Sequence, residues 1–166
     1  MNDLPEILAG NILRERRLKL AAAESCTGGL IGSRITDVPG SSEYFLGSIV
    51  AYSYEVKVSL LDVSWDTLNA FGAVSKETVA EMARGALERL SGDIAIAVSG
   101  IAGPGGGTPE KPVGTTWIGL ATREHEWTKM FRFLGDRQQN KASAADSALE
   151  LLLSYLQGEL KTKGET

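Results

Sequence analysis

The stretch Leu18-Lys19-Leu20-Ala21-Ala22-Ala23-Glu24-Ser25-Cys26-Thr27-Gly28-Gly29 decides the fold. Its first half, 18–23, is short and largely apolar, which predicts a buried strand. Residues 24–27 then predict a loop, and 28–36 a short helix that packs closely because three of its residues are glycines. A buried strand that leads directly into a helix is typical of α/β proteins.

The rest of the chain continues this alternation of helices and strands. Further helices are expected over 4–17 and 136–156, and after the capping residues Ser53, Ser64 and Ser75, the last of these ending at Gly92. Further strands are expected over 45–52, 93–99, 114–122 and 127–133, the last two joined as a hairpin. The pattern predicts a single-domain, layered α/β/α fold with a mixed β-sheet over 1–160, followed by a polar tail over 161–166.

Composition excludes several function classes. The 166 residues carry a net charge of -4, which does not favour a nucleic-acid partner. No apolar run approaches the roughly 20 residues that span a bilayer, so no membrane partner is expected. Cys26 is the only cysteine, and the N-terminal residues do not resemble a signal peptide. A cytoplasmic protein is therefore expected.

Ser25 is the first candidate for catalysis. It would lie beside free N–H groups at a helix N-terminus, where an acyl-transfer intermediate could be stabilised. The alternative is that Ser25 or Thr27 is simply the N-cap of that helix, and the spacing alone favours the cap. Cys26 is a rival nucleophile, but neighbouring side chains of an extended segment point in opposite directions, so only one of the two should face the site.

A serine nucleophile needs a base, and His125 is the only histidine in the chain. A Ser-His-Asp triad or a multi-histidine metal site is therefore disfavoured, and no metal or other cofactor is expected. Lys57 is the best substitute, provided that its pKa falls from ~10.4 toward neutrality. The alternative is an ordinary solvated lysine. Lys111, in a Gly/Pro-rich loop, is a second candidate.

That loop, over 100–114, follows a predicted strand, and ligands bind at this end of strands in open α/β sheets. It matches neither the Walker A motif nor the Gly-x-Gly-x-x-Gly fingerprint, so a nucleoside triphosphate or NAD site is disfavoured. A flexible surface loop is the alternative. Arg137 could bind a phosphate or carboxylate, or it could be a solvated residue behind the helix cap Asp136.

Seven segments together resemble one family. They are Ala-Glu-Ser-Cys-Thr-Gly-Gly (23–29), Pro-Gly-Ser-Ser-Glu-Tyr-Phe (39–45), Ala-Tyr-Ser-Tyr-Glu-Val-Lys (51–57), Gly-Ala-Val-Ser (72–75), Ser-Gly-Ile-Ala-Gly-Pro (99–104), Lys-Pro-Val-Gly-Thr (111–115) and Gly-Asp-Arg (135–137). They occur in the order found in the CinA C-terminal domain family and cover nearly the whole chain.

The resemblance implies a nicotinamide-nucleotide amidase, which converts nicotinamide mononucleotide (NMN) to nicotinate mononucleotide and ammonia by a serine–lysine mechanism. Ser25 would be the nucleophile and Lys57 the base, with Tyr52 assisting or contacting substrate. The backbone around Cys26, Thr27 and Gly28 would form the oxyanion hole. The residues implied in substrate binding are Gly29, Ser99, Gly100, Ala102, Gly103 and Arg137.

The resemblance also implies a homo-oligomer, most simply a dimer, and only the amidase half of relatives that carry an additional nucleotide pyrophosphatase domain. This chain departs from the common family pattern at Ser48, Tyr54 and Lys141, where glycine, asparagine and arginine are usual. Two alternatives remain open: a nucleotide-binding module with weakened catalysis, and an amidase for a related amide.

Overall fold

The fold is built on a five-stranded mixed sheet. A computed structural model describes residues 4–161 and gives the strand order β2-β1-β3-β4-β5. The strands are β1 (Leu20–Glu24), β2 (Phe45–Val50), β3 (Ile94–Gly100), β4 (Thr115–Thr122) and β5 (Glu126–Arg132). β1 pairs in parallel with both β2 and β3, whereas β4 is antiparallel to both of its neighbours. The predicted mixed sheet is confirmed.

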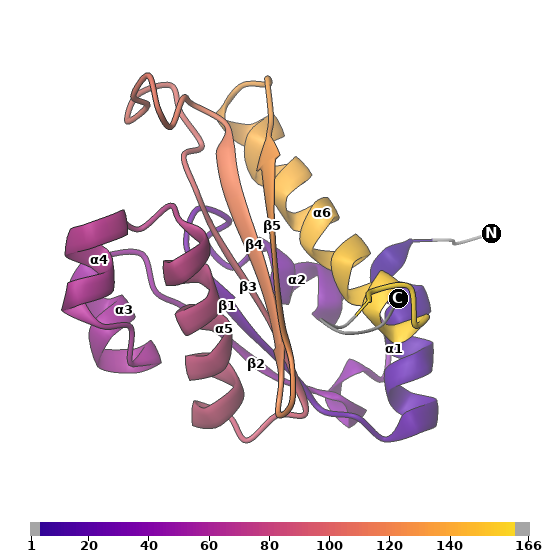
Figure 1. The fold of residues 1–166 in the computed structure, drawn as a ribbon. Coiled ribbons are helices and arrows are strands. Elements are labelled where there is room, and N and C mark those ends of the chain that lie inside the picture. Colours follow the sequence, from indigo (N-terminus) through magenta and orange to yellow (C-terminus); the bar gives the residue numbers. More distant parts are fainter. Residues whose placement is uncertain (1–3, 162–166) are drawn as a thin grey trace.

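Helices cover both faces of this sheet (Figure 1). One face carries α1 (Pro5–Arg16), α2 (Leu30–Thr36) and α6 (Arg137–Leu156), and a short 3-10 helix, Ser41–Glu43, precedes β2. The other face carries α5 (Lys76–Arg89), against which α3 (Tyr54–Leu61) and α4 (Trp65–Phe71) pack. The chain is thus a single α/β domain with an α/β/α arrangement, as the sequence predicts.

Alternation along the central strands divides the core into two layers. Leu20 and Ala22 of β1 face the layer of α1, α2 and α6, whereas Ala21 and Ala23 face α5. The apolar side chains of β1 and β3 that face this layer are all alanines, so α5 can approach the sheet closely. α3 also approaches α5 closely, because a Cβ added at Gly85 would lie 1.9 Å from the Leu61 carbonyl oxygen. This contact fixes the position of α3.

The predicted helix caps are confirmed. Ser53, Ser64 and Ser75 each accept a hydrogen bond from the N–H three residues later. Asp136 forms a complete capping box with Gln139 at the start of α6. These caps satisfy N–H groups that a helix leaves without partners in its first turn, so the sequence locates these helix starts within one residue.

Several predicted boundaries differ from the structure by one or two residues, including the end of the strand expected over 45–52, which is Val50. Glu24, expected in the loop, is the last residue of β1 and is fully buried. The next helix begins at Leu30 rather than at Gly28, because Gly28 and Gly29 have left-handed φ values of 61° and 101°. α5 ends at Arg89, and the left-handed residue after it is Ser91 (φ 55°) rather than the expected Gly92.

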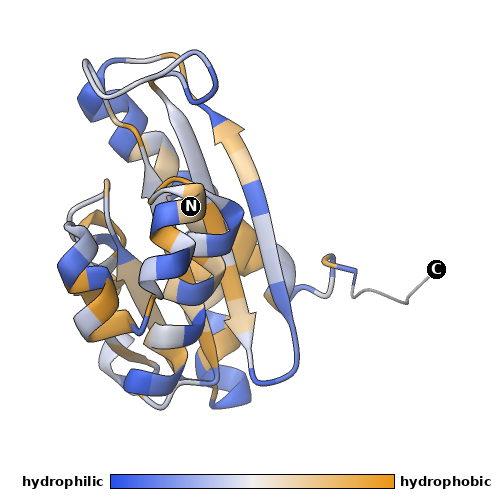
Figure 2. Cartoon of the chain, turned by 60° about the vertical axis from the view of Figure 1, so that its left-hand side comes forward, coloured by the Kyte–Doolittle hydropathy of each residue, from blue (hydrophilic) through white to orange (hydrophobic). Residues whose placement is uncertain are grey.

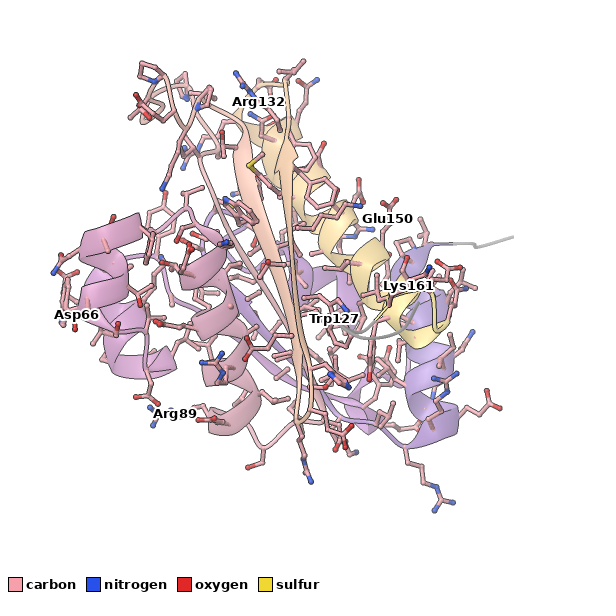
Figure 3. All side chains as sticks on the ribbon, in the orientation of Figure 1. Asp66, Arg89, Trp127, Arg132, Glu150 and Lys161 are labelled. Carbon is pink, nitrogen blue, oxygen red and sulfur yellow. The ribbon has the colours of Figure 1, made fainter. Side chains whose placement is uncertain are left out.

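The surface is ordinary for a globular domain. Figure 2 shows hydrophilic and hydrophobic residues interspersed along the outer helices. Figure 3 shows the charged side chains of Asp66, Arg89, Arg132 and Glu150 on the outside of the layers. Within residues 4–161 no helix is long and apolar enough to cross a membrane. The predicted polar tail lies, beyond Lys161, outside the described residues.

Candidate active site

Ser25 lies directly after β1, at the edge where the three parallel strands end. Its N–H donates to the Val98 carbonyl (3.1 Å), and the Ala51 N–H donates to the Glu24 carbonyl (2.8 Å), so the pairing on both sides of β1 continues to this point. The side chain is 7% exposed. By the alternation of β1 it points to the α5 face of the sheet. This edge is where open α/β sheets bind ligands.

Lys57 reaches Ser25 from the first turns of α3. Its Nζ is 2.9 Å from Ser25 Oγ, and it donates to the carbonyl oxygens of Ala51 (2.8 Å) and Tyr52 (3.1 Å). The residue is 1% exposed, and within the described chain no carboxylate forms an ion pair with it. Burial lowers the pKa of Lys57 to about 8. The alternative of a solvated lysine is therefore wrong for this residue.

Cys26 has a different environment from its neighbour. It packs in the core layer beneath α2 and α6, on the opposite face of the sheet from Lys57. Burial raises the pKa of its thiol to about 11, so the nucleophilic thiolate is scarce at neutral pH. The structure thus favours Ser25 over Cys26 as the nucleophile.

Neither Ser25 nor Thr27 caps α2, so the cap hypothesis is wrong. The N-cap residue is Gly29, which has no side chain to offer. Glu24 replaces it: one carboxylate oxygen accepts from Thr27 Oγ1 (2.7 Å) and Ile31 N–H (2.8 Å). The other accepts from Gly32 N–H (3.1 Å) and from Ser48 Oγ (2.6 Å) on β2. Sequence reasoning assigned no role to Glu24, although it is part of the quoted motif.

The backbone donors near Ser25 differ in availability. The Gly28 N–H is bound to the Ser25 carbonyl (3.1 Å) and so has a partner already. Within residues 4–161, no hydrogen bond engages the N–H groups of Cys26 and Thr27. Of the three residues expected to form an oxyanion hole, Cys26 and Thr27 therefore retain free donors.

Tyr52 and Arg137 meet at the exposed side of the site. Tyr52 is 63% exposed, and its hydroxyl accepts a hydrogen bond from Arg137 Nη2 (3.2 Å). Arg137 Nη1 donates to the Gly103 carbonyl (2.6 Å). Because the Tyr52 carbonyl also binds Lys57 Nζ, these contacts link the first residue of α6 to the buried pair. Arg137 adjoins a hollow of about 360 Å³, lined by Ala102, Pro104, Val113, Gly135, Asp136, Arg137 and Gln138.

Of the other expected substrate-binding residues, Ala102 lines this hollow, whereas Ser99 and Gly100 lie at the end of β3 and make structural contacts. Ser99 is buried, and its hydroxyl donates to the Ala73 carbonyl (2.8 Å). Gly100 is packed so closely that an added Cβ would lie 2.5 Å from Thr116 Oγ1. The Ala102 carbonyl accepts from Asn140 Nδ2 (3.0 Å), a buried contact that the sequence did not reveal. Asn140 thus joins the loop to α6.

A second cation approaches the turn after Ser25. A Cβ added at Gly28 would lie 3.8 Å from Lys141 Nζ, so α6 brings this ammonium group over the turn. A Cβ added at Gly29 would likewise contact a side-chain methyl group of Val50 on β2. Lys111, the second candidate base, lies elsewhere: its Nζ donates to the Phe71 carbonyl (2.5 Å) at the end of α4. That contact ties the 101–114 loop, which extends at the top of Figure 1, to α4.

A second hollow is remote from this site. It measures about 1110 Å³ and lies between α5 and the β4–β5 hairpin, which turns at the opposite end of the sheet. Its charged side chains include both signs, and His125, in the hairpin turn, is exposed. In the part of the chain that the structure describes, no three His, Cys, Asp or Glu side chains are grouped so as to hold a metal ion.

Comparison with known proteins agrees with this architecture. The model of the CinA C-terminal domain matches residues 3–156. A CinA-like protein of Chlorobaculum tepidum is 54% identical over 151 residues, which cover 88% of this chain and 36% of the relative. A CinA-like protein of Thermotoga maritima is 51% identical over 148 residues, 89% of this chain and 36% of the relative. The chain thus spans little more than a third of the length of these curated relatives.

Solved structures show the same fold. A CinA superfamily protein from Klebsiella pneumoniae superposes with a TM-score of 0.89 at 34% identity, covering 93% of this chain and 96% of that one. The competence/damage inducible protein CihA from Agrobacterium tumefaciens gives a TM-score of 0.88 at 38% identity, covering 95% and 98%. The chain belongs to the CinA C-terminal domain family.

Proposed function

We propose that this protein is an amidohydrolase that converts nicotinamide mononucleotide to nicotinate mononucleotide and ammonia, a step in the recycling of pyridine nucleotides. The observation that carries the proposal is the contact between Lys57 Nζ and Ser25 Oγ in a buried site. A hydroxyl beside a buried amine of lowered pKa is the arrangement that a serine–lysine hydrolase requires.

The geometry of the amine supports its role as a base. Nitrogen in a neutral amine has two N–H groups and one lone pair in tetrahedral directions. The carbonyls of Ala51 and Tyr52 accept the two N–H groups, which leaves the lone pair directed at Ser25 Oγ. Neutral Lys57 can therefore take the Ser25 proton as Oγ attacks the carboxamide carbon.

The remaining steps follow from the same pair. The tetrahedral oxyanion would be stabilised by the N–H groups of Cys26 and Thr27. Lys57 returns its proton to the departing nitrogen, the C–N bond breaks, and ammonia leaves. Water then attacks the acyl-enzyme, Lys57 takes a proton from it, and Ser25 recovers that proton as the nicotinate product is released. Every proton is accounted for by one lysine.

The choice of substrate rests on family membership and on the cations around the site. Arg137 and Lys141 both extend from the first turns of α6 toward the turn and loop that surround Ser25. A nucleotide monophosphate would be attracted by this pair, and Arg137 can bind phosphate in a bidentate manner. Arg137 also lines the hollow between the 101–114 loop and the start of α6.

Ammonia release from NMN, measured in the presence of a chelator, tests the proposal. The wild-type protein is expected to release ammonia and nicotinate mononucleotide in equal amounts, and Ser25→Ala to release neither. Ser25 Oγ contacts only Lys57 among the hydrogen bonds of residues 4–161, so Ser25→Ala should retain the melting temperature of the wild type. Near-full activity in Ser25→Ala would exclude the serine mechanism, and activity on nicotinamide or nicotinamide riboside alone would reassign the substrate.

A further inference from the structure

The buried carboxylate of Glu24 lies one residue before the nucleophile and is fully shielded from solvent. Each of its two oxygens accepts one hydroxyl and one backbone N–H: Thr27 and Ile31 on one side, Ser48 and Gly32 on the other. All four partners are donors, so the carboxylate is held as an acceptor only. Four hydrogen bonds of 2.6–3.1 Å compensate for burying its charge.

These contacts surround the turn that carries Ser25. Ile31 and Gly32 supply the second and third N–H groups of α2, the positions that an N-cap side chain normally satisfies. Glu24 performs this role from the strand that precedes the turn. It thereby closes the segment 25–29 into a loop whose two ends are tied to one side chain.

This closure has a consequence for the donors near Ser25. Glu24 occupies the second and third N–H groups of α2, and the first, that of Leu30, donates to the Thr27 carbonyl, so none of the three is available to an oxyanion. The N–H groups of Cys26 and Thr27 lie inside the closed loop, and Thr27 is held there through its own hydroxyl. The orientation of these free amides thus depends on the bond between Thr27 and Glu24.

We propose that Glu24 is a positioning residue that holds the 25–29 turn, and with it Ser25 and the free amides of Cys26 and Thr27, in the geometry for attack. The inference rests on the proposed function in that Ser25 is taken as the nucleophile. Glu24 does not contact Lys57 or Ser25 Oγ, and its effect passes through Thr27 and the start of α2. Ser48, a departure from the usual family glycine, adds the fourth donor from β2.

Two substitutions form a matched pair for the test. Thr27→Val and Ser48→Ala each remove one hydroxyl donor from the same buried carboxylate, and each leaves a backbone N–H on the affected oxygen. Each loss should lower the melting temperature by a similar amount, about 2–5 °C. Only Thr27 belongs to the turn that carries Ser25, whereas Ser48 lies on the neighbouring strand.

The positioning role predicts that the two variants differ in turnover. Thr27→Val should lower kcat by about 10-fold or more with KM for NMN within about 3-fold, because small misplacements of reacting groups cost rate rather than binding. Ser48→Ala should keep kcat within about 3-fold of the wild type. Glu24→Gln replaces one accepting oxygen with an NH2 group, which donates and would face groups that also donate. This variant should lower kcat by about 100-fold. Equal kcat values for Thr27→Val and Ser48→Ala would overturn the inference.

A second measurement separates this inference from the substrate assignment. A fluorophosphonate phosphonylates an activated serine with loss of fluoride, whichever amide the enzyme takes, and intact mass reports the modified protein. The wild type should be labelled at Ser25, Thr27→Val more slowly, and Ser48→Ala at the wild-type rate. Labelling without ammonia release from NMN would reject the substrate and leave the Glu24 role to be decided by these rates. An absence of labelling and activity in the wild type would overturn both proposals.

Discussion

Lys57 Nζ lies 2.9 Å from Ser25 Oγ although the two residues are 32 positions apart and belong to different elements. Lys57 extends from α3 and Ser25 follows β1, and the amine also binds the two carbonyls that lead into α3. A flexible side chain is thus held at three points, all of them away from bulk water. Such a lysine has one geometry and a lowered pKa, both of which suit proton transfer.

Lys57→Gln should remove the base while leaving a polar side chain of similar reach. We expect kcat for ammonia release to fall by about 100- to 10,000-fold, with KM for NMN changed by less than about 3-fold. Lys129→Gln is the matched control, because Lys129 is an exposed residue of the edge strand β5. Equal losses in kcat and in nucleotide affinity would indicate that Lys57 has a structural role instead.

The rate should depend on pH through Lys57. Only the neutral amine can accept the Ser25 proton, and burial holds the pKa of Lys57 at about 8 rather than at its ordinary value of 10.5. The value of kcat/KM should therefore increase about tenfold per pH unit below 8 and level off above it. Initial rates from pH 6 to 10 give this profile. A profile already level at pH 6 would show that Lys57 is not the base.

Cys26 should resist alkylation in the folded protein. Its thiol is buried, and the raised pKa of about 11 leaves little thiolate at pH 8. Treatment with iodoacetamide at pH 8 should leave the intact mass unchanged over an hour, whereas the same treatment in 8 M urea should add one carbamidomethyl group. Rapid labelling of the native protein, with loss of activity, would restore Cys26 as a rival nucleophile.

Arg137→Gln tests whether the phosphate of the substrate is recognised at the start of α6. Arg137 is held by the Gly103 carbonyl and the Tyr52 hydroxyl and keeps further N–H donors for a ligand. We expect KM for NMN to increase about 10-fold or more with little change in kcat. The rate with nicotinamide riboside, which lacks the phosphate, should be the same in both proteins. A parallel loss for both substrates would assign Arg137 to loop structure.

Gly85→Ala should destabilise the contact between α3 and α5. The added Cβ would lie 1.9 Å from the Leu61 carbonyl oxygen, so the two helices must separate. Overpacking of this kind costs roughly 1–3 kcal/mol, and thermal unfolding followed by circular dichroism would measure the loss. Gly105→Ala is the control, because no heavy atom lies within 4 Å of its added Cβ. Equal melting temperatures for the two variants would contradict the assigned contact.

The elements of this fold could be predicted because their signals are local. Ser53, Ser64, Ser75 and Asp136 mark helix starts through hydrogen bonds to residues three positions away, which a sequence displays directly. The alternation of apolar residues identifies the strands in a similar way. The errors in the predicted helix boundaries also have a local cause. The left-handed φ values of Gly28, Gly29 and Ser91 decide where a helix begins or ends, and several neighbouring residues could have adopted such a φ value instead.

The partners within the site could not be predicted from local signals. Glu24 bonds to Ser48 across 24 positions, and Asn140 to the Ala102 carbonyl across 38. Spacing alone favoured a helix cap for the hydroxyls of the turn, because the sequence does not show that a carboxylate from the preceding strand takes that place. Family resemblance pointed to Ser25 and Lys57, and the burial that lowers the lysine pKa became visible only in three dimensions.

Because side chains alternate along β1, three consecutive residues at its end have three different environments. Glu24 joins α2, Ser25 meets Lys57, and Cys26 enters the opposite core layer. Inserting or deleting a single residue within β1 would therefore move every later side chain of the strand to the opposite face of the sheet. A carboxylate or a thiol would then face the Lys57 amine in place of the Ser25 hydroxyl, and the wrong side chains would enter the core. Single substitutions in this segment can have graded effects, but a change of length shifts every following side chain. Insertions and deletions should therefore be tolerated in loops such as 101–114 and not in β1.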